Sequence, residues 1–291
     1  MFDTFRNLLE ITGQLTTITA LRISAGRSSE PIGSDLPVIK DALGNPLIPG
    51  SSFKGAMRSC LESFLRGIVG TNRKLVANPA IEEEWSITSQ EMKQLKDKCN
   101  NDETLTEELI KQTDLTSLLF GSPWIASKFQ VRDLTVVADT WFGQYQERDG
   151  VAIDRDTETA AEGKLYDFQV VPAGTRFEFK AVVENAEKHE LGLLMVGLHQ
   201  FETEQIPLGG GRSRGLGVVK LEIEKMRWFD VENDPNKLLT YLKELVNSDD
   251  IDNISSYEDG NTFKKQWTEA LINKLSKNIA NTSTTEATQN S

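Results

Sequence analysis

A short run of small polar residues, Gly50-Ser51-Ser52, stands just before a stretch in which apolar residues recur at helical spacing. The first N–H groups of a helix have no partner inside the helix, and they favour anions. Lys54 and Arg58 are four residues apart, so they share one helical face and can contact successive phosphates. The pattern predicts a phosphate site made by Ser51, Ser52, Lys54 and Arg58. The alternative, which the residues by themselves favour, is that Ser51 caps the helix while both cations are solvated.

A second candidate is the glycine-rich loop 209–217, in which five glycines alternate with Arg212 and Arg214. Glycine lets the backbone approach a ligand closely, so Gly209, Gly210 and Gly211 are candidate backbone contacts and the two arginines are candidate side-chain contacts. The loop lacks the Lys-Ser/Thr ending of a nucleotide P-loop and the GxGxxG spacing of a dinucleotide site. The alternative is an ordinary turn that leads into a strand.

The elements that position these residues follow from hydrophobic periodicity and from Gly/Pro breakers. A long loop over 24–50 separates the first strand from the first helix. Strand patterns cover about 8–23, 128–140, 165–171, 175–184 and 218–229, and helical patterns cover about 53–69, 187–203, 235–247 and 261–279.

This order predicts an α+β protein with a ferredoxin-like (RRM-like) βαββαβ core, a helical insertion and a thumb hairpin. The first half of the core, with the long loop and the first helix, is expected within 1–70, and an acidic helical insertion within 71–120. The second half is expected within 121–230, with the hairpin at about 145–164. A helical extension over 231–280 and a disordered tail over 281–291 complete the chain.

The charge of the chain is unevenly distributed. The formal net charge is −12, which by itself disfavours a nucleic-acid partner because phosphate binding depends on Lys and Arg. Residues 20–75 nevertheless hold eight basic and four acidic groups, a local +4, whereas residues 80–120 hold four basic and ten acidic groups, a local −6. This distribution permits nucleic-acid binding on a basic face without proving it.

Several other classes of protein are disfavoured. No apolar run approaches the roughly 18 residues of a membrane helix, so no membrane partner is expected. The first fourteen residues lack the apolar core of a secretion signal, and Cys60 and Cys99 form no framework, so a reducing cytoplasm is the expected location. His189 and His199 have no neighbouring ligand pattern, and no metal cluster is assigned to them.

Three segments resemble the RAMP superfamily, and within it the multi-copy backbone subunit of type III CRISPR effector complexes. They are SDLPVIKDALGNPLIPGSSFKGAMRS (34–59), RDGVAIDRDTETAAEGKLYDFQVVPAGTRF (148–177) and PLGGGRSRGLGVVKL (207–221). The resemblance covers about a quarter of the chain, in the family's order. It implies that the phosphate site and the glycine-rich loop contact RNA, and that the partners are a CRISPR guide RNA, a target RNA and other effector subunits.

The resemblance also implies a catalytic role for Asp35, the acidic residue before the Pro-Val of the long loop. In the family this residue supports metal-dependent cleavage of target RNA, so Asp35 is the expected ligand of a divalent ion, magnesium or manganese. The implied reaction is attack of a 2′-hydroxyl on the adjacent phosphate. The alternatives are a solvent-exposed turn aspartate in a catalytically silent structural subunit, a guide-processing nuclease, and an unrelated phosphate-binding enzyme. Both histidines follow residue 188, which disfavours the nuclease, and the missing nucleotide motif disfavours the enzyme.

Overall fold

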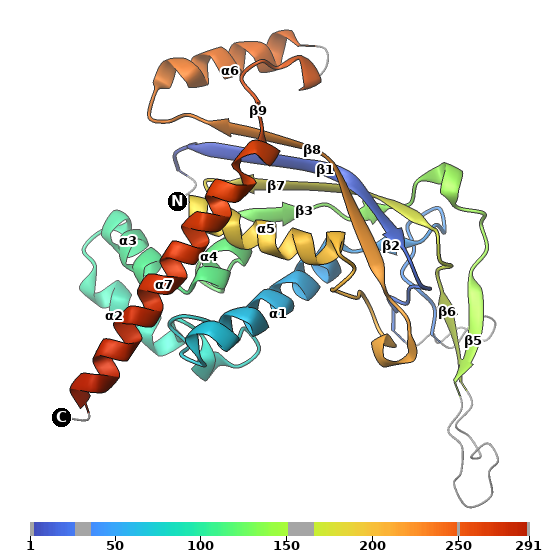
Figure 1. Ribbon diagram of the computed structural model, residues 1–291, viewed down its shortest axis with the longest axis horizontal. Helices are drawn as coiled ribbons and strands as arrows, with labels where there is room; N and C mark the ends of the chain where they lie inside the picture. Colours follow the sequence, from blue (N-terminus) through green and yellow to red (C-terminus); the bar gives the residue numbers. More distant parts are fainter. Residues whose placement is uncertain (1–2, 27–35, 151–165, 249–250, 290–291) are drawn as a thin grey trace, which may run out of the picture.

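The computed structural model describes residues 3–26, 36–150, 166–248 and 251–289, and its centre is an antiparallel sheet (Figure 1). Five strands form the sheet, in the order β3 (Phe129–Val131), β7 (Arg176–Glu184), β1 (Asn7–Thr17), β8 (Val219–Asp230) and β9 (Glu258–Asp259). The register places Leu9 of β1 between Val183 of β7 and Trp228 of β8. The predicted α+β class is confirmed.

Apolar and polar residues alternate along the strands, so the sheet has one apolar and one polar face. In β7, Phe177 and Phe179 are buried, whereas Glu178 between them is exposed. Glu178 lies opposite Gln14 of β1, and Gln14 lies opposite Glu222 of β8. This row of cross-strand neighbours is polar, so it offers no aromatic platform on which RNA bases stack in RRM domains.

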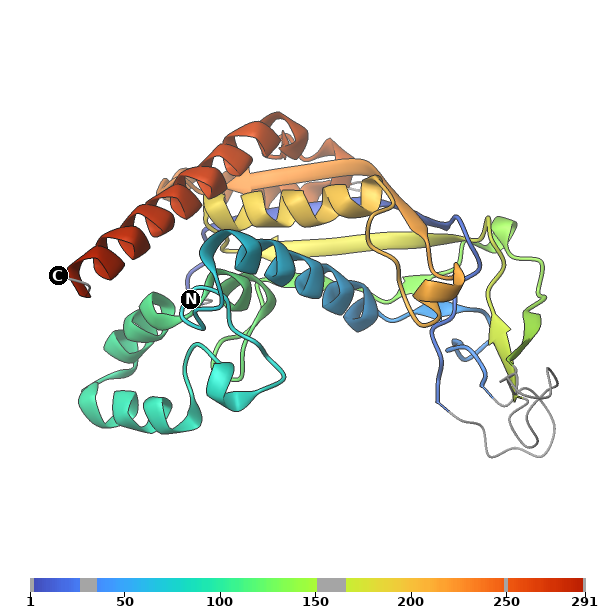
Figure 2. The ribbon, with the colours of Figure 1, turned by 60° about the horizontal axis from the view of Figure 1, so that its bottom comes forward.

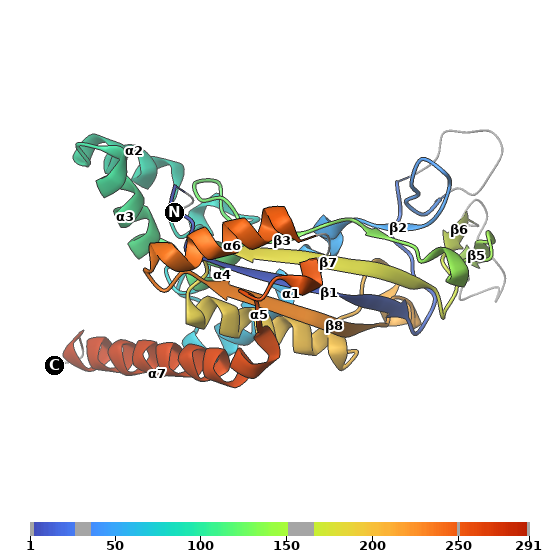
Figure 3. The same cartoon turned by 90° about the horizontal axis from the view of Figure 1, so that it is seen from above.

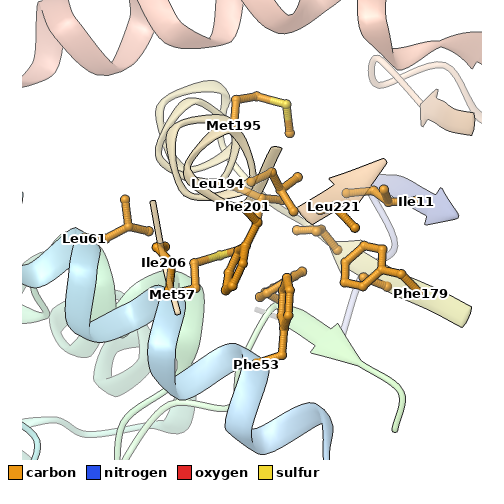
Figure 4. Packing of buried hydrophobic residues seen from close by; sticks show 14 of the residues in the cluster. Ile11, Phe53, Met57, Leu61, Phe179, Leu194, Met195, Phe201, Ile206 and Leu221 are labelled. Carbon is orange, nitrogen blue, oxygen red and sulfur yellow. The ribbon is translucent and has the colours of Figure 1, made fainter. Parts of the chain in front are cut away.

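Helices α1 (Gly50–Val69) and α5 (Lys188–Glu202) cover the apolar face (Figure 2). Phe53 of α1 stacks on Phe201 of α5 with ring centroids 4.2 Å apart, and it lies 5.0 Å from the ring of Phe179. Met57, Leu194 and their neighbours fill the space around these rings (Figure 4). Burial of these large apolar side chains holds the two helices on the sheet.

The region predicted as a helical insertion contains α2 (Ser89–Lys98), α3 (Asp102–Gln112) and α4 (Leu115–Phe120). It has its own small hydrophobic cluster, formed by Ile87, Met92, Leu95, Leu109 and Ile125. Helix α2 begins with a capping box, in which Thr88 Oγ1 accepts from the N–H of Glu91 at 3.2 Å and the Glu91 carboxylate accepts from the N–H of Thr88 at 2.8 Å.

The C-terminal extension adds one helix over the sheet face opposite α1 and α5, and a second helix beside α5 (Figures 1 and 3). Helix α6 (Pro235–Asn247) lies against a cluster that contains Phe229 and Tyr241, whose rings stack 4.2 Å apart. Helix α7 (Lys264–Gln289) packs against α5 through the buried Trp267. Its backbone stays helical to Gln289, within the segment 281–291 that the sequence predicts to be disordered.

Two short antiparallel ladders lie beyond one end of the main sheet, beside the glycine-rich loop (Figures 1 and 2). One joins β2 (Leu47–Ile48) to β4 (Leu134–Thr135), and the other joins β5 (Gln146–Gly150) to β6 (Tyr166–Val170). The second ladder is the base of the hairpin predicted at about 145–164; residues 151–165 of this hairpin lie outside the described residues.

Candidate functional site

Helix α1 begins three residues earlier than the sequence predicts. Pro49 is its N-cap residue and provides no side-chain cap, and the N–H of Gly50 donates to Asp133 Oδ1 at 2.8 Å. The alternative that Ser51 caps the helix is therefore wrong, because Pro49 occupies the N-cap position and a carboxylate 83 residues away accepts from the N–H of Gly50. Ser51 is exposed and Ser52 half-buried. Their predicted contact with RNA stays a prediction.

Glycine is required at the start of α1 because the helix abuts the end of β3. A Cβ added at Gly50 would collide with the carbonyl oxygen of Val131. The close approach fixes the first turn of α1 against the strands at this end of the sheet.

Lys54 and Arg58 lie on one helical face, as their spacing predicts, and that face contacts the segment 117–127. Lys54 Nζ donates to Ser127 Oγ at 2.6 Å, and burial, with a smaller effect from the charge of Arg58, lowers the pKa of Lys54. Arg58 donates to Glu62 Oε1 at 2.7 Å and to the Gly121 carbonyl at 2.9 Å.

These contacts exclude the alternative that both cations are solvated. They also mean that each cation already has protein partners, so contact with RNA phosphates has to be added to these bonds or replace them. The phosphate role of Lys54 and Arg58 stays a prediction.

The glycine-rich loop is docked on the chain that follows β1. The N–H of Gly210 donates to the Arg22 carbonyl at 2.8 Å, and the N–H of Gly217 donates to the Ala20 carbonyl at 2.9 Å. Gly209 has a φ of 73°, and a Cβ there would collide with the Arg22 carbonyl. Close packing is therefore one physical reason for the glycines, beside the predicted access to a ligand.

Both arginines of the loop are exposed. Arg212 Nε donates to the Gly209 carbonyl at 3.2 Å, and Arg214 donates to the Tyr166 hydroxyl at 3.0 Å. The hydrogen bond from Arg214, with the positive charges of Arg214 and Arg22, lowers the pKa of Tyr166. Arg214 thereby connects the loop to the base of the β5–β6 hairpin.

A third arginine, Arg22, also contacts the base of the β5–β6 hairpin. Its guanidinium carbon lies 4.5 Å from the centroid of the Phe168 ring. Arg22 belongs to the basic segment 20–75, but the sequence alone assigns neither Arg22 nor Tyr166 to the site. The one available signal was the Tyr-Asp-Phe run at 166–168, which places two aromatic rings on one face of a strand.

Asp35 lies outside the described residues, and the structure shows how the chain continues after it. Leu36 forms a parallel bridge with Phe168, and its carbonyl accepts from the N–H of Gln169 at 3.1 Å. Leu36 also packs against the cluster of Ala20, Phe168, Val170 and Leu216. The loop that carries Asp35 therefore rejoins the fold at the cluster to which the glycine-rich loop also contributes.

The described residues contain no group of three or more His, Cys, Asp or Glu side chains able to hold a metal ion. His189 is half-buried on α5, and the exposed His199 is 3.2 Å from Glu202. The divalent ion expected at Asp35 stays a prediction, because Asp35 lies outside the described residues. The same residues include no helix long and apolar enough to cross a membrane.

Comparison with known proteins decides the family. A family model for the RAMP superfamily matches residues 14–220, which include the start of α1, the helical region and the glycine-rich loop. The chain belongs to the RAMP superfamily.

The RAMP assignment made from three sequence segments is confirmed, and similar proteins support it. The chain is 26% identical to a CRISPR system Cms endoribonuclease Csm3 of Streptococcus thermophilus over 219 residues, 74% of this chain and 87% of the relative. It is also 26% identical to a protein of the same name from Enterococcus italicus over 221 residues, 75% of this chain and 91% of the relative. A Mycobacterium tuberculosis relative of that name is 49% identical over 55 residues, 18% of this chain and 23% of the relative.

The match to the RAMP model ends at residue 220, close to the start of β8. Helices α6 and α7 therefore follow the matched region. All of the predicted site residues lie inside it.

Proposed function

We propose that this chain is an RNA-binding backbone subunit of a type III CRISPR effector complex that cleaves target RNA paired to the guide. The similar proteins are named CRISPR endoribonucleases. The observation that carries the proposal is the meeting of Arg22, Arg214 and the aromatic pair Tyr166 and Phe168, beside the residue that follows Asp35.

The chemistry of this cluster suits a nucleic acid. Arginines bind phosphates through several N–H donors, and aromatic faces stack on bases. The polar side of the sheet lacks such rings in the row through Gln14, so we place the RNA across the end of the sheet instead of on its face. The strand order supports a ferredoxin-like core, which leaves this end open for the long loop, the hairpin and the glycine-rich loop.

The proposed cleavage uses a 2′-hydroxyl of the RNA as nucleophile. Its oxygen attacks the adjacent phosphorus, the bond from phosphorus to the 5′-oxygen breaks, and the proton lost by the nucleophile is balanced by one gained by the leaving oxygen. The products are a cyclic phosphate and a 5′-hydroxyl end. Asp35 would orient the 2′-hydroxyl or hold a cation near the phosphate.

A bound magnesium or manganese ion would supply positive charge beside the phosphate. We derive no step through this ion, because Asp35 lies outside the described residues. The metal requirement is a proposal that a chelator tests directly.

The decisive experiment is a cleavage assay on the guide-loaded complex with the wild type, Asp35→Asn and the control Asp139→Asn. Asp139 is exposed and follows β4, so the control removes one carboxylate of the same kind. We expect Asp35→Asn to abolish cleavage while target binding persists, and Asp139→Asn to cut at the wild-type rate. A wild-type complex that binds target but never cuts would favour a silent structural subunit instead.

A further inference from the structure

A pocket of about 380 Å³ lies between α1 and the helical region 82–127, away from the arginine cluster of the glycine-rich loop. Arg58 of α1 forms one wall, and Trp85, Ser117 and the loop 121–127 form the others. This volume is at the lower end of ligand pockets, so it suits one heterocycle better than a whole cofactor.

Two indole rings face this pocket at a fixed angle. Trp85 and Trp124 have ring centroids 6.4 Å apart and planes inclined by 77°. Trp85 Nε1 donates to the Pro79 carbonyl at 3.1 Å, and Trp124 Nε1 donates to the Ile87 carbonyl at 2.8 Å. Because the polar edge of each ring is held by backbone, each ring is preorganised to offer apolar surface to a flat ligand.

The lining also carries hydrogen-bond donors. Ser122 Oγ accepts from the N–H groups of Trp124 and Ile125, at 3.2 and 3.1 Å, and neither bond uses its hydroxyl proton. The Arg58 guanidinium has five N–H groups, and its bonds to Glu62, Gly121 and Ser117 account for three of them. An apolar side chain in the pocket would leave these donors without an acceptor, whereas the edge of a base provides acceptors.

The position of the pocket connects it to the proposed RNA path. Ser127, which accepts the hydrogen bond of Lys54 Nζ, lines the pocket together with Arg58. Of the two cations predicted to contact phosphates, Arg58 therefore forms part of the wall, and Lys54 is bonded to a residue that lines it. An RNA strand whose phosphate backbone follows this face of α1 would have a base within reach of the two indole rings.

We propose that this pocket binds one unstacked nucleobase of the RNA that follows α1, stacked against Trp124 or Trp85. The proposal rests on the proposed RNA-binding function and adds a base-binding site to it. It assigns the helical region 82–127 a direct role in holding RNA.

The test measures binding of a single-stranded RNA that contains 2-aminopurine to the whole chain. We expect Trp124→Leu to weaken binding about five- to tenfold and to reduce the quenching of 2-aminopurine. Trp124→Phe, which retains an aromatic ring, should restore most of both signals. The control is Phe64→Leu, since Phe64 is an exposed aromatic residue of α1 outside the pocket lining.

A second measurement avoids dependence on how well the variants fold. In wild-type protein labelled with 5-fluorotryptophan, the ¹⁹F resonances of Trp85 and Trp124 should shift when RNA is added, and that of the buried Trp267 should not. RNA that binds with unchanged resonances and with wild-type affinity for Trp124→Leu would overturn the base-binding proposal while RNA binding stands. Resonances that shift only when another protein subunit is added would also overturn it, and a chain that binds no RNA would overturn both proposals.

Discussion

Arg214 donates a hydrogen bond of 3.0 Å to the hydroxyl of Tyr166, and this contact joins the glycine-rich loop to the first residue of β6. The two residues are 48 positions apart in the chain. The glycine-rich loop and the base of the hairpin are therefore in direct contact at the place where we propose that RNA binds.

This contact predicts the order in which the tyrosines ionise. The chain has four tyrosines. The bond from Arg214 lowers the pKa of Tyr166, whereas burial raises the pKa of Tyr145 to about 12 and also raises the pKa values of Tyr241 and Tyr257. In an alkaline titration followed by ultraviolet absorbance, Tyr166 should ionise first, below the usual value of about 10.

Two variants check this assignment. Tyr166→Phe should remove the first ionisation step, and Arg214→Ala should move that step to higher pH. A first step that survives in Tyr166→Phe would contradict the contact.

The pair Lys54 and Arg58 predicts a combined effect on RNA binding and on stability. If both side chains contact phosphates, the double variant Lys54→Ala, Arg58→Ala should have a smaller slope of log affinity against log salt concentration, by about one per lost contact. The decrease should be the same for every RNA sequence. The internal bonds to Ser127 and Glu62 predict in addition a lower melting temperature.

The control for this pair is Lys93→Ala with Lys96→Ala, which removes two exposed cations from α2. It should leave the salt slope unchanged. If the Lys54 and Arg58 double variant also keeps the wild-type slope, these residues have a structural role only.

A buried ion pair supports the core. Lys128 Nζ lies 2.6 Å from Glu190 Oε2, with side chains only 4% and 1% exposed. Lys128→Met leaves a buried carboxylate without its partner, so unfolding in urea should show a loss of about 3–5 kcal/mol. Lys180→Met is the matched control, because Lys180 pairs with Glu178 at 3.2 Å on the exposed face, where about 0–1 kcal/mol is expected. Equal effects of the two variants would contradict the burial of the first pair.

The lowered pKa of Glu91 predicts that the stability of the helical region depends on pH. Its hydrogen bond to Arg73 is the main cause that lowers its pKa to about 2. Because the pKa is lower in the folded than in the unfolded chain, this stabilisation is complete above about pH 4.5 and is lost as the pH falls toward 2.

Melting temperatures measured against pH check this sign. The difference between the wild type and Glu91→Gln should be largest near neutral pH and should shrink below about pH 4. The exposed Glu83→Gln serves as control. A difference that grows as the pH falls would contradict the assignment.

The sequence predicted the elements whose periodicity is locally clear. Helix α5 was expected over 187–203 and lies at Lys188–Glu202, and the strand expected over 175–184 is Arg176–Glu184. In both, alternation or helical spacing of apolar residues reports the buried face directly.

The elements that the sequence missed depend on partners distant in the chain. The start of α1 was placed too late because its cap comes from Asp133, which no local pattern reveals. Arg58 was expected to face solvent or phosphate, but Ser117 and the Gly121 carbonyl hold it against the helical region, and Glu62 pairs with it along α1. Tyr166 and Arg22 gain a role only when the glycine-rich loop is docked beside them.

The most direct test of the account is target-RNA cleavage by the guide-loaded complex with wild-type subunit and with Asp35→Ala. Removing this carboxylate leaves Arg22, Arg212 and Arg214 in place, so affinity for target should persist while the rate of the chemical step falls. We predict products with cyclic phosphate and 5′-hydroxyl ends from the wild type, inhibition by a chelator, and no products from Asp35→Ala. Cleavage by Asp35→Ala at the wild-type rate would contradict the account.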